Sequence, residues 1–400
     1  MKNLIKLIEN HRPGISLEQD FFCDKKIFEA DIEHIWGKEW LFAGFEAQIP
    51  NSGDYVLYNL SNESVIIIRG NEGQLHAHFN TCRHRGSIIC TEEKGNARNL
   101  ICPYHCWVYE KNGDLKAARL MPKDFDKTEY GLKSVHLEIL DGLIFICLAN
   151  SPKPFTSIST EFQPFLEPFE FANAKIARQD RYECHGNWKL FAQNFRECYH
   201  CGPAHPEYCN AVVGANFMED DELSDYLEES KKNWRTKGLA INTVNINNSS
   251  HYAVRYPLRR GVKSYSLDGN PVSSLMGRHV DYDNGVVGLV TFPNFWLDAV
   301  SDYAWAMRIT PKDATSCFVD ITFLVDKDAI EGKDYKLNTL TQFWDITGGQ
   351  DWELIKNNQK GIESDSYSPG PYANVEEEVK VFDNWYISKL KLGLNPKREE

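Results

Sequence analysis

"CRHRGSIICTEEKGNARNLICPYHCW" (residues 82–107) holds two pairs of side chains that bind metals. Cys82 and His84 form the first pair, Cys102 and His105 form the second, and seventeen residues separate His84 from Cys102. Each pair offers one thiolate and one imidazole from a short segment. The stretch therefore predicts a metal centre built from two Cys-His loops.

A Rieske [2Fe–2S] cluster and a zinc site are the two alternatives for this centre. A Rieske cluster places two thiolates on one iron and two histidines on the other, which matches pairs that contribute one of each. Zinc accepts the same ligands, but zinc fingers usually place both cysteines before both histidines. The observed order favours the iron–sulfur cluster. We interpret Cys90 and Cys106 as packing thiols and Trp107 as a wall of the cluster pocket.

The pattern of apolar residues around this stretch changes twice along the chain, from helical to β-rich and then to a linker. Residues 16–40 have helical spacing of apolar residues. Short β-branched and aromatic runs separated by turn residues then predict an antiparallel β-rich unit with strands at 54–60, 64–70, 75–80 and 141–149. "NSPKPFTS" (residues 150–157) is a predicted linker, because two prolines and three hydroxyl residues interrupt the pattern.

The longer second half predicts an α+β domain. Trp188, Phe191, Phe195 and Tyr199 recur at helical spacing, which predicts one helix with a buried aromatic stripe that stops at Gly202. Alternating apolar residues predict strands, and amphipathic stretches predict two late helices. The strands are expected within 285–300, 302–311 and 316–326, and the helices near 350–364 and 375–391.

Composition excludes several classes of protein. A net charge of −13 without a long basic run argues against a nucleic-acid partner, and it is compatible with a cationic substrate. No apolar run is long enough for a signal peptide or a membrane span, so we expect no membrane association and a cytoplasmic location. Eleven cysteines in such a chain are expected to be free thiols or metal ligands.

"NFRECYHCGPAHPEY" (residues 194–208) suggests a second centre. Glu197 and His200 are three residues apart and share one face of the predicted helix, and His205 follows just after the Gly-Pro stop. Two histidines and a carboxylate from elsewhere would form the facial triad of a non-haem Fe(II) oxygenase. A cluster that only carries electrons needs such a destination. The alternative for Glu197 is an exposed helix charge.

"CRHRG" and "CPYHCW" resemble the two ligand loops of Rieske non-haem iron oxygenases, with Gly86 and Pro103 at the places typical of that family. The resemblance continues from residues 20–44 through 266–277 to 366–372, and the chain is identified as similar to the large (alpha) terminal oxygenase subunits. It implies an all-β Rieske domain at 46–150 and a catalytic domain of the helix-grip type at 151–400. Residues 1–45 are then a helical segment that packs with the catalytic domain.

The resemblance also implies the roles of individual residues. Cys82, His84, Cys102 and His105 would hold the Rieske cluster, and His200 and His205 would bind the mononuclear iron. Glu197 would be the acidic bridge to His84 or His105 of a neighbouring subunit. Asp345 and Asp351 are the candidates for the third iron ligand. We choose Asp351, because the family's aspartate opens a helix that continues to Gln-X-Gly, as Gln359 and Gly361 do here.

The wording "RECYHC" and "SLDGNPVS", with Glu in place of Asp at the bridge, is most similar to oxygenases that demethylate quaternary ammonium compounds such as glycine betaine and stachydrine. This branch implies O2-dependent hydroxylation of an N-methyl group and release of formaldehyde. The alternatives are an aromatic ring-hydroxylating dioxygenase and a non-enzymatic electron carrier or zinc-stabilised binding protein. Aromatic faces attract cations, but the substrate contacts stay unassigned among six candidates, Tyr252, Tyr256, Phe295, Trp296, Tyr303 and Trp305.

The expected partners follow from what the chain lacks and from the family. No G-x-G-x-x-G follows a strand, so electrons from NAD(P)H are expected to arrive through a separate flavin and iron–sulfur reductase. The family resemblance implies a homotrimer, because the two metal centres of one subunit lie too far apart for efficient electron transfer.

Overall fold

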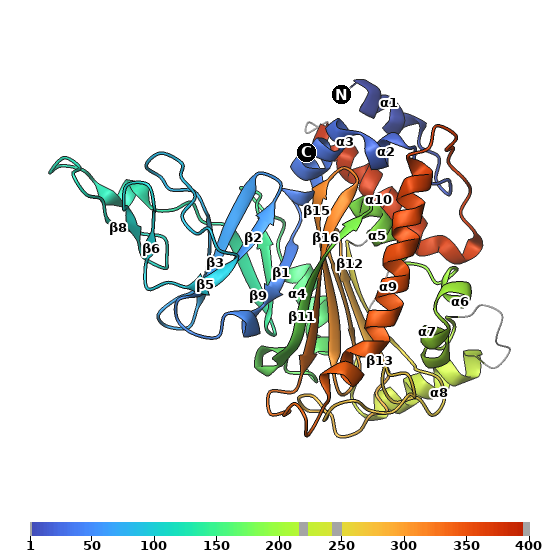
Figure 1. Ribbon diagram of the computed structural model, residues 1–400. Helices are drawn as coiled ribbons and strands as arrows, with labels where there is room; N and C mark the ends of the chain where they lie inside the picture. The colour runs from blue at the N-terminus through green and yellow to red at the C-terminus, as the bar shows by residue number, and fades with distance from the viewer. Residues whose placement is uncertain (1, 216–222, 242–249, 395–400) are drawn as a thin grey trace.

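The computed structural model describes residues 2–215, 223–241 and 250–394. A small β-rich unit projects from a larger unit whose centre is a six-stranded sheet (Figure 1). Helix α1 (Lys2–Asn10) packs against the last helix, α10 (Glu377–Leu394), so the two ends of the described chain lie on the same part of the larger unit. The predicted α+β class is confirmed.

Three small antiparallel sheets build the small unit and attach it to the rest. Their strand orders are β4-β3-β2-β5, β6-β7-β8 and β1-β10-β9. Each of the strands predicted in this half is present, shifted by two residues at most. The strands are β1 (Leu41–Phe45), β2 (Asp54–Leu60), β3 (Glu63–Arg69), β4 (Leu75–Phe79), β5 (Lys94–Asn96), β6 (Leu100–Ile101), β7 (Val108–Tyr109), β8 (Leu115–Ala117), β9 (His136–Leu140) and β10 (Leu143–Cys147).

The larger unit contains an antiparallel sheet with the order β11-β16-β15-β14-β13-β12. Strands β12 to β16 follow one another as neighbours, and β11 returns beside β16. Both faces are covered, which is why β13 is buried along its whole length. The strands are β11 (Lys175–His185), β12 (His251–Tyr256), β13 (Val286–Thr291), β14 (Phe295–Ala299), β15 (Ala304–Asp313) and β16 (Ser316–Val325).

Helix α9 (Leu337–Ile362) crosses one face of this sheet and packs against β11, α5 and α7 (Figure 1). It begins thirteen residues before the predicted late helix at 350, because apolar residues from Leu340 onward already face the core. The other helices are α2 (Asp20–Cys23), α3 (Lys25–Asp31), η1 (Ile32–Trp36), η2 (Glu46–Gln48), η3 (Lys127–Tyr130), α4 (Thr156–Leu166), η4 (Phe171–Asn173), α5 (Trp188–Asn194), α6 (Cys201–Ala204), α7 (Pro206–Ala211), α8 (Leu223–Thr236) and η6 (Asn374–Glu376).

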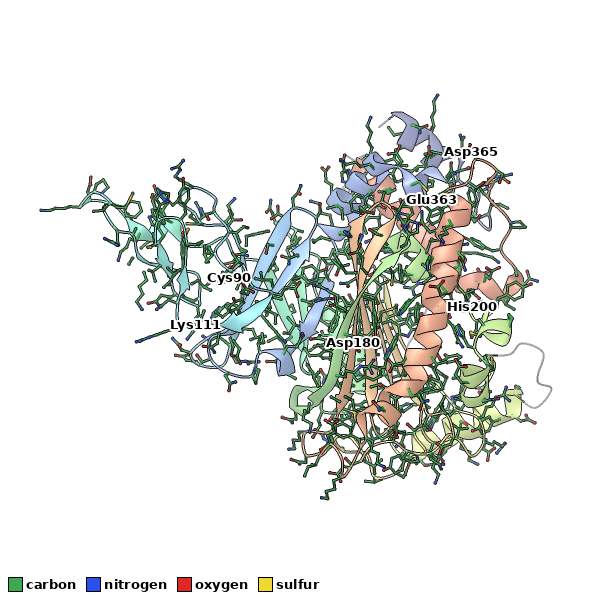
Figure 2. The ribbon with its side chains drawn as sticks, in the orientation of Figure 1. Cys90, Lys111, Asp180, His200, Glu363 and Asp365 are labelled. Atoms are coloured by element: carbon green, nitrogen blue, oxygen red, sulfur yellow. A yellow bond between two sulfur atoms is a disulfide. The ribbon has the colours of Figure 1, made fainter. Side chains whose placement is uncertain are left out.

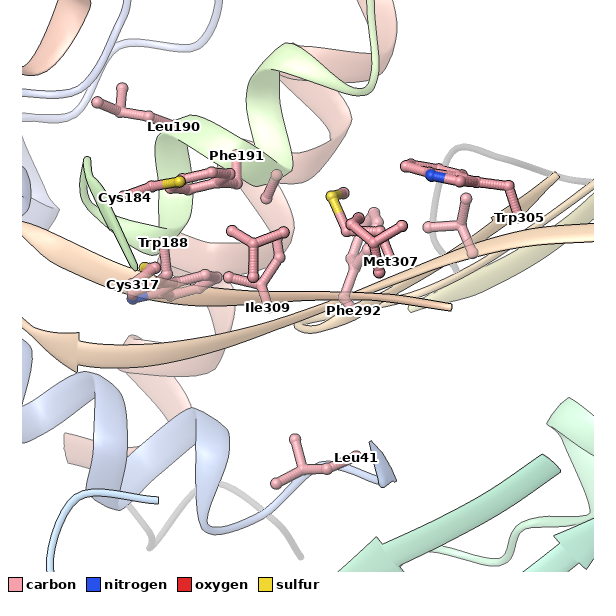
Figure 3. Packing of buried hydrophobic residues seen from close by; sticks show 14 of the residues in the cluster. Leu41, Cys184, Trp188, Leu190, Phe191, Phe292, Trp305, Met307, Ile309 and Cys317 are labelled. Atoms are coloured by element: carbon pink, nitrogen blue, oxygen red, sulfur yellow. The ribbon is translucent and has the colours of Figure 1, made fainter. Parts of the chain in front are cut away.

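The main core lies between the sheet and helix α5. Figure 3 shows Phe191 of α5 above Ile309 of β15, with Trp188 of α5 and Cys317 of β16 in the same buried cluster. The opposite face of the sheet packs against a second cluster that includes Phe42 of β1 and residues of β10 and α4. Strand β10 ends before residue 150 and α4 begins after it, and the division into 1–45, 46–150 and 151–400 stays a prediction.

A buried ion pair joins the N-terminal helices to the larger unit. Lys189 Nζ lies 2.6 Å from Asp31 Oδ2, and both side chains are fully buried. Trp188 Nε1 donates to the same carboxylate at 3.0 Å, and the Tyr386 hydroxyl donates to its other oxygen at 2.8 Å. Three elements that are distant in sequence, α3, α5 and α10, therefore meet at one carboxylate.

Replacing Asp31 tests this network, because Asp31→Asn leaves the Lys189 ammonium without its counter-charge. Removing one partner of a buried pair costs about 3–5 kcal/mol of unfolding free energy. We expect a loss of this size in urea unfolding followed by circular dichroism. The double variant Asp31→Asn with Lys189→Met should recover a large part of it, because no buried charge remains.

Glu29→Ala is the matched control on the same helix. Glu29 pairs with Lys25 at 3.9 Å, and the two side chains are 62% and 86% exposed. Exposed pairs contribute less than about 1 kcal/mol. An equal loss in Glu29→Ala and Asp31→Asn would contradict the assignment of Asp31 as the joining residue.

Candidate functional site

The two Cys-His loops have the same backbone turn. The Gly86 amide donates to the Cys82 carbonyl at 2.9 Å, and the Cys106 amide donates to the Cys102 carbonyl at 3.0 Å. Gly86 and Cys106 both have positive φ, +76° and +55°, in the left-handed region that favours glycine. This turn leaves Cys106 exposed, so its interpretation as a packing thiol was wrong, whereas Cys90 is buried as predicted.

The ligand atoms of the two loops converge. The ring centroids of His84 and His105 are 4.6 Å apart, and Cys82 and Cys102 are buried. Both imidazole Nδ1 atoms are buried without a hydrogen-bond partner within the described chain. An unsatisfied buried nitrogen costs free energy, and burial also raises the pKa of the Cys82 thiol. A metal cluster would satisfy both nitrogens and stabilise both thiolates.

Neighbouring side chains fix this first centre. The Tyr109 hydroxyl lies 3.2 Å from Cys82 Sγ and accepts a hydrogen bond from the Arg83 amide at 3.0 Å. The Trp107 ring is buried and stacks on His84 with 4.8 Å between centroids, in agreement with a wall of the pocket. The loops adjoin β6 and β7 at the far end of the small unit (Figure 1).

The segment of the second centre is not one continuous helix. Helix α5 ends at Asn194, and Glu197 and His200 lie on the turn before α6. The Glu197 carboxylate accepts hydrogen bonds from the Tyr199 and His200 amides, which is the local bonding that ends helices and starts new ones. Tyr199 is 60% exposed, so the predicted aromatic stripe stops at Phe195.

Three side chains from separate elements meet beside α9. The Nε2 atoms of His205 and His200 lie 3.0 Å and 3.3 Å from Asp351 Oδ1. The ligand atoms of the three residues are all within 4.8 Å of one another. Figure 2 shows His200 next to α9, on the side where α6 and α7 lie. Two imidazoles and one carboxylate form the donor set that binds Fe(II) and leaves positions open.

The electrostatics of this group favour a bound cation. Burial alone lowers the pKa of His200, but hydrogen bonds with Asp351 and Glu197 raise it to about 9. In His205, contacts with Asp351 and Gln350 likewise outweigh the effect of burial, so the pKa of His205 is raised. Burial raises the pKa of Asp351, yet the two histidines hold it below its usual value. The site therefore draws in positive charge, which a divalent metal supplies.

The structure places Asp351, and not Asp345, with the two histidines. Arg178 Nη1 donates a hydrogen bond to Asp345 Oδ2 at 2.8 Å, and the Thr341 hydroxyl donates to the same oxygen at 2.8 Å. Six residues turn an α-helix by about 240°, so the two aspartates point to different sides of α9. Asp351 lies in the middle of α9, so the expectation that it opens a helix was wrong.

The sequence did not identify Gln350, the residue whose side chain contacts the imidazole of His205. The Gln350 amide lies 2.6 Å from His205 Nδ1, and Glu197 Oε1 lies 2.6 Å from His200 Nδ1. Each ring is thus oriented through its outer nitrogen, as is common around metals. Only its place beside Asp351 in the sequence could have pointed to Gln350.

A small cavity adjoins the three ligating side chains. Aromatic rings form much of its wall, contributed by Phe195, Tyr208, Trp296 and Trp344. Of the six aromatic candidates from the sequence, Trp296 alone is among the described residues that line it. Trp305 stacks on Trp344 with 4.2 Å between centroids and supports this wall from behind.

Comparisons with known families match this architecture. Residues 39–136 match the family described as "Rieske [2Fe-2S] domain", and residues 171–392 match "Ring hydroxylating alpha subunit (catalytic domain)". The chain is 37% identical over 391 residues to the glycine betaine monooxygenase oxygenase subunit of Pseudomonas aeruginosa strain UCBPP-PA14, covering 96% of this chain and 91% of that protein. It is 30% identical over 360 residues to the carnitine monooxygenase oxygenase subunit of Acinetobacter baumannii, covering 87% and 85%.

Solved structures share the fold. A quaternary ammonium Rieske monooxygenase in complex with L-carnitine aligns with a TM-score of 0.70 at 19% identity, over 96% of this chain and 97% of that one. Naphthalene 1,2-dioxygenase from Rhodococcus sp. aligns with a TM-score of 0.67 at 17% identity, over 98% of both chains. The chain belongs to the Rieske oxygenases and has the domains of their ring-hydroxylating alpha subunits.

Membership in this family defines the chain as an oxygen-incorporating oxidoreductase with a Rieske [2Fe–2S] cluster and a mononuclear iron. Both donor sets fit. The buried, unpaired Nδ1 atoms of His84 and His105 suit the cluster, and the convergence of His200, His205 and Asp351 suits the iron. None of the helices in the described residues is both long and apolar enough to span a bilayer.

The choice between the two aspartates can be checked by metal analysis. Asp351→Ala is expected to keep the Rieske absorption and lose the mononuclear iron, lowering total iron by about a third, because one iron joins the two of the cluster. Asp345→Ala should keep all its iron. Normal iron in Asp351→Ala, or selective loss in Asp345→Ala, would contradict the placement.

Proposed function

We propose that the protein is the terminal oxygenase of a multicomponent Rieske system that demethylates a quaternary ammonium compound of the glycine betaine or stachydrine type. The aromatic cavity beside His200, His205 and Asp351 carries the proposal. Each aromatic face contributes about 0.5–2 kcal/mol to the binding of a cation. The similarity to a glycine betaine monooxygenase subunit over most of the chain supports the same substrate class.

In this proposal, Cys82, His84, Cys102 and His105 hold the cluster, and His200, His205 and Asp351 hold the iron. The iron, when bound, supplies the activation of dioxygen that a C–H bond requires. Gln350 and Glu197 keep the two imidazoles oriented through their outer nitrogens. The rings around the cavity position an N-methyl group and exclude water from it.

The overall reaction consumes one dioxygen, two electrons and two protons. One oxygen atom enters a methyl C–H bond and the other leaves as water. The resulting N-hydroxymethyl ammonium breaks its C–N bond, the electron pair stays on nitrogen, and formaldehyde and one proton leave. The products are formaldehyde and a tertiary amine.

Electrons are proposed to come from NAD(P)H through a separate reductase and to cross between subunits of a homotrimer in the cytoplasm. The cluster loops lie at the far end of the small unit, whereas α6 and α7 lie beyond α9 on the opposite side of the larger unit (Figure 1). Transfer within one chain would cross the whole sheet. A head-to-tail ring brings one subunit's cluster to the next subunit's Glu197, whose carboxylate already contacts His200.

A formaldehyde assay tests the substrate class. The holoenzyme with a reductase and NADH is expected to release formaldehyde from glycine betaine or stachydrine, with one dioxygen consumed for each formaldehyde. Naphthalene and benzoate serve as the comparison, because the alternative function, aromatic dihydroxylation, would form a cis-diol. A cis-diol without any formaldehyde from the methylammonium panel would overturn the proposal in favour of that alternative.

Glu197→Gln tests the bridging role, because the amide keeps the shape of the side chain and loses its charge. We expect normal iron and a normal cluster spectrum, with electron transfer from the cluster slowed by at least about tenfold in single-turnover measurements. Glu353→Gln is the control, since Glu353 pairs with Lys356 at 2.9 Å and its side chain is 64% exposed. Equal electron-transfer rates in Glu197→Gln and the wild type would contradict the bridging role of Glu197.

A further inference from the structure

The cavity beside the iron ligands contains a carboxylate that the proposed reaction does not yet use. Asp298 of β14 lines the cavity and is 3% exposed. The other two carboxylates of the lining are engaged, Asp351 by two histidines and Glu197 by His200. Asp298, in contrast, has only neutral partners: its Oδ1 atom is buried without a hydrogen bond of normal geometry among the described residues, and Tyr256, Trp296 and Tyr265 are the polar side chains nearest to the carboxylate.

Neutral side chains and the neighbouring strand hold Asp298 in place. The Tyr256 hydroxyl donates to Asp298 Oδ2 at 3.1 Å and lies 2.7 Å from the Tyr265 hydroxyl. On the neighbouring strand β13, Gly288 is the cross-strand partner of Asp298. A Cβ atom at Gly288 would lie 3.3 Å from Asp298 Oδ1, so the carboxylate packs closely against β13 at a position where a side chain would crowd it.

A buried oxygen without a partner costs free energy unless something in the cavity satisfies it. Burial raises the pKa of Asp298 to about 7, and a bound cation would favour its ionised form. A quaternary ammonium group has no N–H to donate, so charge and aromatic faces are the means of recognising it. Trp296 lies two residues before Asp298 on β14 and therefore presents its ring on the same face of the strand.

The charged residues that line the cavity also favour a cationic substrate. Among the described residues that line it there is no lysine or arginine, so an anionic aromatic substrate would meet no basic partner there. The ring centroids of Phe195 and Trp296 are 5.8 Å apart, and Trp344 of α9 lines the cavity as well. Aromatic rings and one buried carboxylate without a charged partner together suit a methylated cation.

We propose that Asp298 is the counter-charge that binds the cationic head of the substrate and so determines the specificity of the cavity for methylammonium compounds. This inference rests on the proposed function, because it concerns the substrate of the same site. Asp298 acts through its negative charge at the wall of the cavity, whereas Tyr256 is a positioning residue that acts through Asp298.

A matched pair of ligands separates charge from shape. Glycine betaine and 3,3-dimethylbutanoate have the same carboxylate and nearly the same outline, but the second has a neutral carbon in place of the ammonium nitrogen. Isothermal titration of the holoenzyme gives a dissociation constant for each. We expect Asp298→Asn to weaken betaine binding at least about tenfold and to leave the neutral analogue unchanged or bound more tightly.

Two further variants keep the test interpretable. Tyr256→Phe should weaken betaine binding less than Asp298→Asn, and again without weakening the neutral analogue. Asp302→Asn is the control, because Asp302 is also buried but is held by Ser264 at 2.8 Å and by the Val272 amide at 2.7 Å, outside the cavity. It should bind both ligands as the wild type does. Iron content and the cluster spectrum verify that each variant is intact.

The inference is overturned if Asp298→Asn binds betaine as tightly as the wild type, or if it loses affinity equally for both ligands. Formaldehyde release by the wild type judges the proposed function separately. A wild type that binds the cation through Asp298 yet forms no formaldehyde would end the proposed function and leave the role of Asp298 standing. If the wild type releases formaldehyde and Asp298→Asn binds betaine as tightly as the wild type, the proposed function stands and the role of Asp298 is overturned.

Discussion

The contact of Asp351 with His200 and His205 is the constraint on which the catalytic unit depends. His205 and Asp351 are 146 residues apart, and α9 must cross the sheet at one position for their atoms to meet at 3.0 Å. Asp351 lies between Thr347 and Ile355 on the buried face of α9, where its neighbours one turn away are also buried. A carboxylate on that face loses its hydration, and two histidines with a metal compensate for the loss. The packing of α9 on α5 and β11 therefore also positions the three residues that we propose as iron ligands.

Two carboxylates with different environments divide the work of one cavity. Asp351 faces the histidines, which lower its pKa, whereas Asp298 faces neutral side chains, and burial raises its pKa to about 7. The environment of Asp351 suits a metal ion, and the proposed role of Asp298 is to attract the cationic substrate. The aromatic wall between them is supported from behind by Trp305, which belongs to the core of the sheet. The proposed substrate site thus shares side chains with the packing that stabilises the domain.

The sequence predicted local features better than the lengths of helices. The strands of the small unit and the two Cys-His loops depend on neighbouring residues, so their pattern was readable, and Gly86 marks a turn that needs a positive φ. The helix through 188–199 was predicted too long, because apolar spacing does not register that the Glu197 carboxylate bonds the Tyr199 and His200 amides. Helix α9 was predicted too short, because its first half reads as buried only once the sheet is in place.

By itself, the sequence determined the chemistry: the donor types, their pairing within short loops, the presence of a second histidine pair and the family to which they point. These properties depend on residues within a few positions of each other. Only the tertiary structure decided which aspartate meets the histidines, which aromatic rings line the cavity, and that Asp298 lines it as a buried carboxylate. The reason is that these relations arise from the crossing of α9 over the sheet and from cross-strand register. The crossing brings together residues as far apart as His205 and Asp351, and the register depends on the pairing of whole strands.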